Sequence, residues 1–98
     1  MTLYVIPRRR AWLSDEQLAA SAGCVPAVNA TMEGEVRWIR SYVVREEDGA
    51  YTGYCVYEAA SEDALRRHAE ALKLPADAIQ PVHATLVARP DPAPVVAV

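Results

Sequence analysis

The stretch GEVRWIRSYVVREEDGAYTGYCVYEA, residues 34–59, decides the fold that this chain can adopt. Apolar and polar side chains alternate on both sides of Asp48-Gly49, a pattern that is typical of a β-hairpin. A three-residue turn pairs even-numbered positions with even-numbered ones, whereas a two-residue turn pairs them with odd-numbered ones. We expect the three-residue turn, because it places the smaller side chains beneath the helices, namely Ile39, Ser41, Val43, Gly53 and Cys55.

A helix is predicted before this hairpin. Ser14, followed three residues later by Gln17, fits a capping box and predicts a helix that runs to about Met32. Pro26 removes a backbone donor within this helix, so we expect a kink or a break there. The apolar stripe of the helix consists of Leu18, Ala19, Ala22, Val25 and Val28.

A second helix is predicted in SEDALRRHAEALKL, residues 61–74, with Ser61 as its cap. Its apolar face carries Leu65, His68, Ala69 and Leu72. We therefore expect His68 to be buried and neutral near pH 7. Its ring proton would then be donated to a strand carbonyl or to Tyr57.

Two further strands are predicted at the ends of the domain. The first is TLYVIPR, residues 2–8, which Pro7 and the basic run Arg8-Arg9-Arg10 should end. Such a basic run is expected to be a solvated edge or an anion contact. The second is AIQPVHATLVA, residues 78–88, which Pro81 marks as an edge strand.

The order strand, helix, strand, strand, helix, strand predicts a ferredoxin-like βαββαβ fold of the α+β class. Such a domain has a four-stranded antiparallel sheet with two helices on one face, which leaves the other face open. We expect one domain over residues 1–98, with a core at about residues 2–88. The Pro-rich tail, residues 89–98, ends in the apolar segment VVAV, which we expect to pack on a second copy of the chain.

Composition excludes several classes of protein. A chain of 98 residues builds a modest core, which a second copy often completes. The net charge of −3 and the pI near 5.3 argue against nucleic-acid binding, which requires a basic surface. No apolar run is long enough to span a membrane, and the start lacks a secretory signal, so we expect a cytoplasmic protein. Cys24 and Cys55 are expected to be buried free thiols.

The predicted pairing gathers aromatic and ionisable side chains on the open face. Beside Val36, Ile6 and Val56, this face should carry Tyr4, Trp38, Arg40, Tyr42, Tyr54, Glu58 and His83. Aromatic walls with a few placed charges are typical of a small-molecule pocket. The same residue types are also enriched in dimer interfaces, so both interpretations stay open. In the interface interpretation, Arg40 and Glu58 simply pair across the hairpin.

The segments VRWIRSYVV, YCVYEA, ALRRHA and LPADAI resemble a family of small bacterial ferredoxin-like proteins of unknown function. Some members of that family are described as nickel-binding dimers. The resemblance covers roughly residues 2–88 and implies a homodimer that binds a divalent metal such as nickel. The histidines of this chain, His68 and His83, are the metal-ligand candidates, although no C-x-x-C or H-x-H pair supports them.

Three functional hypotheses follow from these observations. The first is a ligand-binding or metal-ion-binding homodimer, with its pocket on the open sheet face. The second is a small enzyme of the isomerase, cyclase or oxygenase type, in which Glu58 or His83 acts as general acid or base. The third is a structural or accessory protein, whose aromatic face is only an interface.

Overall fold

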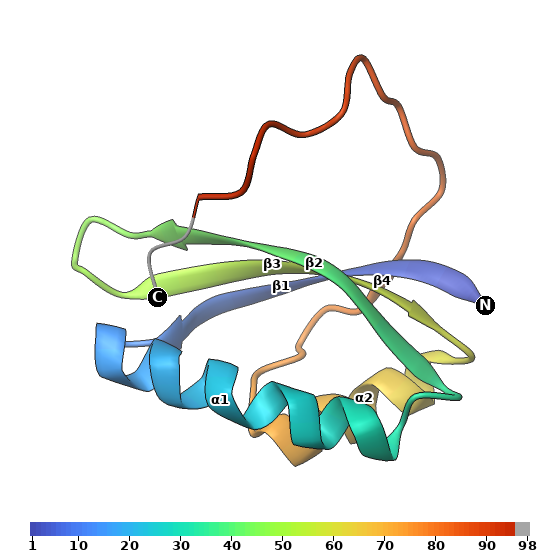
Figure 1. Ribbon diagram of the computed structural model, residues 1–98, viewed down its shortest axis with the longest axis horizontal. Coiled ribbons are helices and arrows are strands. Elements are labelled where there is room, and N and C mark those ends of the chain that lie inside the picture. Colours follow the sequence, from blue (N-terminus) through green and yellow to red (C-terminus); the bar gives the residue numbers. More distant parts are fainter. Residues whose placement is uncertain (96–98) are drawn as a thin grey trace.

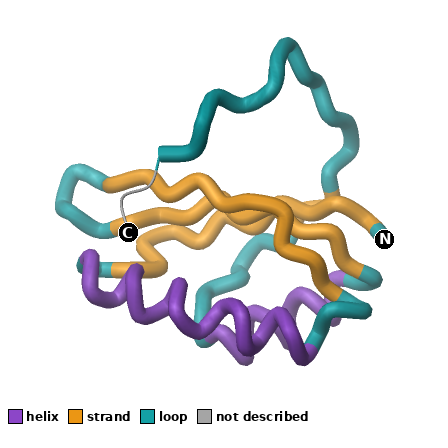
Figure 2. The backbone as a smooth tube through the Cα atoms, in the orientation of Figure 1, coloured by secondary structure: helices purple, strands orange, loops and turns teal. Residues whose placement is uncertain are grey.

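The computed structural model describes residues 1–95 of the chain. Its elements are β1 (Thr2–Trp12), α1 (Asp15–Thr31), β2 (Val36–Arg45), β3 (Tyr51–Ala59), α2 (Glu62–Leu72) and β4 (Gln80–Pro81). The strands form one four-stranded antiparallel sheet in the order β2-β3-β1-β4, and both helices lie on one side of it (Figure 1). This arrangement confirms the predicted ferredoxin-like α+β fold. On the opposite side, Figure 2 shows only the chain that follows β4.

The turn between β2 and β3 has the predicted length. Arg45 pairs with Tyr51, and the Glu46 amide donates to the Ala50 carbonyl at 2.7 Å, which leaves three residues in the turn. Gly49 adopts a φ of 92°, which a residue without a side chain reaches at little cost. The even-to-even pairing therefore holds along the hairpin as far as Arg40, which lies opposite Val56.

Beyond Arg40, an irregularity in β2 changes the register. Ile39 is the additional residue, because Trp38 pairs with Tyr57 while Arg40 pairs with Val56. One extra residue in a strand turns the side chains that precede it to the other face of the sheet. The prediction that Val36 and Trp38 lie on the open face is therefore wrong.

The register of β1 also differs from the prediction. Tyr4 lies opposite Tyr57 and Ile6 lies opposite Cys55, so both residues face the helices rather than the open side. They belong to the core, which consists of Tyr4, Ile6, Val36, Cys55, Tyr57, Ala59, Ala64, Leu65 and Ile79. The sequence pattern of this strand does not show whether its even-numbered or its odd-numbered side chains face the helices.

Strand β1 continues through Pro7 to Trp12, which corrects the predicted end at residue 8. Pro7 is tolerated because β4 pairs only with Tyr4 and Val5, so no neighbouring strand on that side needs its missing amide hydrogen. Arg8 is fully buried and is not part of a solvated edge. Its Nη1 donates to the Pro75 carbonyl at 2.7 Å and its Nη2 to the Tyr57 hydroxyl at 3.2 Å.

Helix α1 begins as predicted, because the Ser14 side chain accepts a hydrogen bond from the Gln17 amide. The predicted break is absent, since the helix continues through Pro26 to Thr31. Pro26 and Ala22 are both exposed, so solvent can satisfy the carbonyl that the proline leaves unpaired. Within the predicted apolar stripe, only Leu18 is buried.

Helix α2 follows the prediction closely. The Ser61 side chain accepts from the Ala64 amide and caps the helix. The helix ends at Leu72, and Lys73 caps it in a left-handed conformation with a φ of 56°. The predicted inward face is buried, and it comprises Leu65, His68, Ala69 and Leu72, together with Ala64.

The last strand is shorter than predicted. β4 contains only Gln80 and Pro81, followed by one hydrogen bond from the Val82 amide to the Leu3 carbonyl. Residues 83–95 are exposed and arch over the open face of the sheet (Figure 1). The end of the VVAV segment, for which packing on a second copy was predicted, lies outside the described residues. Within residues 1–95, neither helix is both long and apolar enough to cross a membrane.

Gly53 in β3 is expected to be intolerant of a side chain. A Cβ at this position would lie 3.0 Å from two ring carbons of the buried Trp12. Gly53→Ala should therefore lower the free energy of unfolding by about 1–3 kcal/mol, as overpacking does elsewhere. Urea denaturation of the two proteins measures this difference.

The matched control is Gly23→Ala in α1, where a Cβ meets no atom within 4 Å. This change should raise the stability by about 0.5–1 kcal/mol, because alanine favours a helix more than glycine does. Equal stability of Gly53→Ala and the natural protein would contradict the packing described for Trp12.

Candidate functional site

The open face of the sheet is defined by cross-strand neighbours from three strands. The register places Pro7, Tyr42 and Tyr54 in one row, Val5, Arg40 and Val56 in the next, and Leu3 and Glu58 in a third. Of the predicted open-face cluster, the structure therefore brings together Arg40, Tyr42, Tyr54 and Glu58. Tyr42 and Tyr54 remain 49% and 36% exposed, so both rings are accessible.

Three other members of the predicted cluster lie elsewhere. Tyr4 is 9% exposed and is packed in the core. Trp38 donates its indole hydrogen to Ser41 Oγ at 2.9 Å and lines a hollow of about 360 Å³ between α1 and β2. His83 is exposed and follows β4 outside the sheet.

The charged centre of the open face contains a residue that the sequence reasoning missed. Arg40 Nη1 donates to Asp91 Oδ2 at 2.7 Å and to the Tyr42 hydroxyl at 3.3 Å. The Tyr42 hydroxyl in turn donates to the same Asp91 oxygen. The predicted pair between Arg40 and Glu58 does not form, because Glu58 lies opposite Arg37 instead.

These contacts favour the charged forms of both partners. The Tyr42 hydrogen bond, assisted by the Arg40 charge, lowers the pKa of Asp91 below its ordinary value. The pKa of Arg40 is raised, chiefly through its hydrogen bond to Tyr42. Asp91 lies in a Pro-rich tail, and no local pattern of that tail predicts a partner on β2.

A second polar cluster lies between the sheet and the helices. His68 is 1% exposed, its Nε2 lies 2.8 Å from Asn29 Oδ1, and its ring meets that of Tyr57 edge to face at 5.4 Å. Burial lowers the pKa of His68, and the nearby Arg8 charge lowers it further. The predicted burial of His68 is confirmed, but its partner is the Asn29 side chain rather than a strand carbonyl or Tyr57.

The side chains that could hold a metal ion are not gathered in one place. Within residues 1–95, no three His, Cys, Asp or Glu side chains form a group that could bind a metal. His68 is enclosed beside a cation, and His83 is exposed outside the sheet. Cys55 is buried as predicted, whereas Cys24 is exposed on α1. One chain, as far as the structure describes it, does not fit a resident nickel ion.

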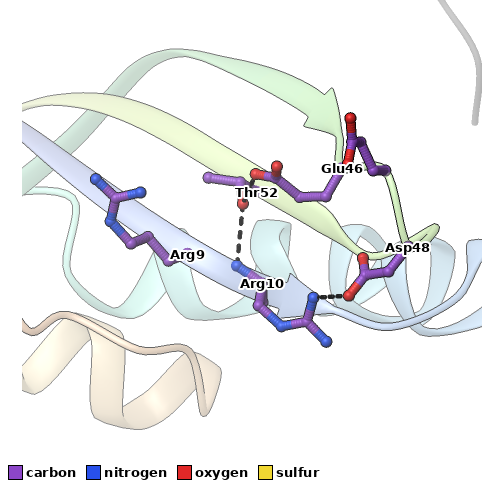
Figure 3. A pocket seen from close by; sticks show the side chains of 6 residues that line it. Arg9, Arg10, Glu46, Asp48 and Thr52 are labelled. Carbon is purple, nitrogen blue, oxygen red and sulfur yellow. Dashed lines mark hydrogen bonds and ion pairs between the residues drawn. The ribbon is translucent and has the colours of Figure 1, made fainter.

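A hollow of about 480 Å³ lies at the hairpin end of the sheet (Figure 3) and is lined by Arg9, Arg10, Glu46, Glu47, Asp48 and Thr52. Four of these residues, Arg10, Glu46, Asp48 and Thr52, form contacts with one another. The Arg10 amide donates to Thr52 Oγ1 at 3.1 Å, and this hydroxyl donates to Glu46 Oε1 at 2.7 Å. Arg10 also forms an ion pair with Asp48. These contacts hold the turn against β1.

The lowered pKa of His68 predicts a pH dependence of stability. The imidazole of the unfolded chain takes up a proton more readily than the buried imidazole of the folded protein. The contribution of His68 to the free energy of unfolding should therefore be complete above the ordinary histidine pKa near 6.5 and be lost as the pH falls below it. His68→Gln should abolish this dependence while keeping a hydrogen bond to Asn29. Denaturant titrations between about pH 5 and pH 7 measure it.

The matched control is His83→Gln, because His83 is exposed and outside the sheet. Its pH dependence should equal that of the natural protein. If His68→Gln loses as much stability as the natural protein when the pH falls from about 7 to about 5, the buried imidazole is not the cause of the loss.

The fold matches the crystal structure of SCO4226 from Streptomyces coelicolor A3(2), with a TM-score of 0.64 and 21% sequence identity over 86% of this chain and 99% of that chain. At this identity, the match supports the fold alone. No curated protein matches the chain. Residues 4–82 match the family described as "Nickel responsive protein SCO4226-like". Because this match covers most of the sequence, the chain belongs to the family of nickel responsive, SCO4226-like proteins.

Proposed function

We propose that this protein is a homodimer that binds a small ligand on the open face of its sheet. The observation that carries the proposal is the grouping of Arg40, Tyr42, Tyr54 and Glu58 on the one sheet face that no helix covers. Aromatic walls beside a few charged groups are what small-molecule sites commonly offer. The pocket then lies between two copies of the chain, with these side chains on its walls.

The need to cover apolar surface supports the dimer. Tyr42 and Tyr54 are accessible, and Leu3, Val5 and Val56 beside them are only partly buried. Apolar patches larger than a few hundred Å² are uncommon on monomers. A second sheet placed against this face would bury the patch and enclose the charged groups among aromatic rings. The proposal places the protein in the cytoplasm, where the free thiols Cys24 and Cys55 stay reduced.

Nickel enters the proposal through the family description. Nickel favours imidazole, thiolate and carboxylate ligands, and no group of three such side chains occurs in residues 1–95 of one chain. A nickel site built from these residues would therefore take ligands from both protomers. His83 is the imidazole available for it, because His68 is enclosed and bonded to Asn29.

Light scattering should give twice the chain mass of 10.7 kDa at tens of micromolar protein. Tyr54→Asp should give a monomer, because it places a charge at the centre of the proposed interface. The matched control is Val43→Asp. Val43 lies on β2 opposite Gly53, on the side of the helices, so this variant should remain a dimer. If Tyr54→Asp forms a dimer, or if the natural protein is a monomer, the open face is not the dimer interface.

Nickel binding, measured by calorimetric titration of tag-free protein, should depend on the dimer. Nickel bound by the natural protein should be lost in Tyr54→Asp and in His83→Ala, because each change removes part of a site shared by two chains. His68→Gln should bind as the natural protein does. Full binding by the monomeric variant would show that a single chain supplies all the ligands.

A further inference from the structure

We propose that Arg40 and Tyr42 form a binding site for a carboxylate group, and that the ligand of the open face is a small carboxylic acid with an aromatic or apolar body. Asp91 occupies this site as a tethered stand-in for the ligand. The inference rests on the proposed function, because it concerns the same face of the sheet. It adds the chemical class of the ligand and the element that competes with it.

The geometry of the two donors carries the first step. Arg40 and Tyr42 are separated by one residue on β2, so they project to the same side of the sheet. A guanidinium hydrogen and a phenolic hydrogen are both directed at a single carboxylate oxygen, Asp91 Oδ2. A cation and a neutral donor that meet on one oxygen form a charge-assisted site for a carboxylate.

The position of Asp91 in the chain carries the second step. The family match ends at residue 82, so Asp91 lies in a tail that follows the matched domain. The tail leaves β4 and reaches β2 only after arching above the sheet (Figure 2). Leu86 and Val87 in the arch are 96% and 73% exposed, so neither packs on the face beneath it.

The ion pair is itself accessible, and a ligand can therefore replace it. The side chains of Arg40 and Asp91 are 50% and 48% exposed. Exposed ion pairs contribute little to stability, since water and salt screen them. A free carboxylate that also buries an apolar body gains more from the site than Asp91 does.

The residues around Arg40 and Tyr42 indicate what the apolar part of the ligand should be. The Tyr42 ring lies opposite Tyr54 in the register, and Val56 lies opposite Arg40. Two tyrosines and a valine beside a cation fit a flat aromatic or branched apolar group with one acidic end. An aromatic acid meets both requirements, with its ring over the tyrosines and its carboxylate on Arg40.

Sodium benzoate is a suitable test ligand, and benzamide is its uncharged counterpart. Titrations of isotope-labelled full-length protein, followed by NMR, should show saturable benzoate binding that shifts the Arg40 and Tyr42 signals. Benzamide should not bind, because it lacks the charge. Asp91→Asn should bind benzoate about fivefold more tightly, since it removes a weak tethered competitor. Asp77→Asn, a change of the same kind at an exposed position after α2, should match the natural protein.

Two outcomes would overturn the inference. Benzoate affinity that is the same in Asp91→Asn and Asp77→Asn would show that the tail does not compete for the site. Absence of benzoate binding in both the natural protein and Asp91→Asn, up to the solubility of the salt, would show that Arg40 and Tyr42 do not form a carboxylate site. Neither outcome affects the test of the dimer, which is the mass of the Tyr54→Asp variant in light scattering. Failure of the carboxylate site is therefore distinguishable from failure of the proposed function.

Discussion

The placement of β3 between β1 and β2 is the constraint on which the rest of the molecule depends. Successive side chains of a strand point to opposite faces, so β3 supplies both surfaces of the sheet. Cys55, Tyr57 and Ala59 are buried beneath the helices, while Tyr54 and Glu58 lie on the open side with Arg40 and Tyr42. A slip of one residue in its pairing would exchange the core and the candidate site.

Much of the fold was predictable because local signals act over short distances. The Asp48-Gly49 turn set the pairing of the adjacent hairpin, and the Ser61 cap and the apolar face located α2. Beyond those signals, prediction depended on long-range pairing. The bulge at Ile39 has no signature in the sequence, so Trp38 was assigned to the wrong face. Tyr4 was misplaced because nothing within β1 shows which of its two faces lies toward the helices.

The candidate site was predictable only in part for the same reason. Arg40, Tyr42, Tyr54 and Glu58 follow from the hairpin pattern, and all four share one face. Asp91 was missed because the contact between the tail and β2 joins residues 51 positions apart. Family membership did not reveal it either, since the matched region ends at residue 82.

The two arginines Arg8 and Arg40 show why the open face, rather than the core cluster, suits a reversible ligand. Arg8 is fully buried, and its Nη1 and Nη2 donate to the Pro75 carbonyl and the Tyr57 hydroxyl, groups that belong to the fold itself. Loss of either contact would leave a buried guanidinium donor without a hydrogen-bond acceptor, which is costly. Arg40 is half exposed, and water can take the place of Asp91 at little cost. A guanidinium whose partner exchanges without unfolding the domain is the one that can bind and release a ligand.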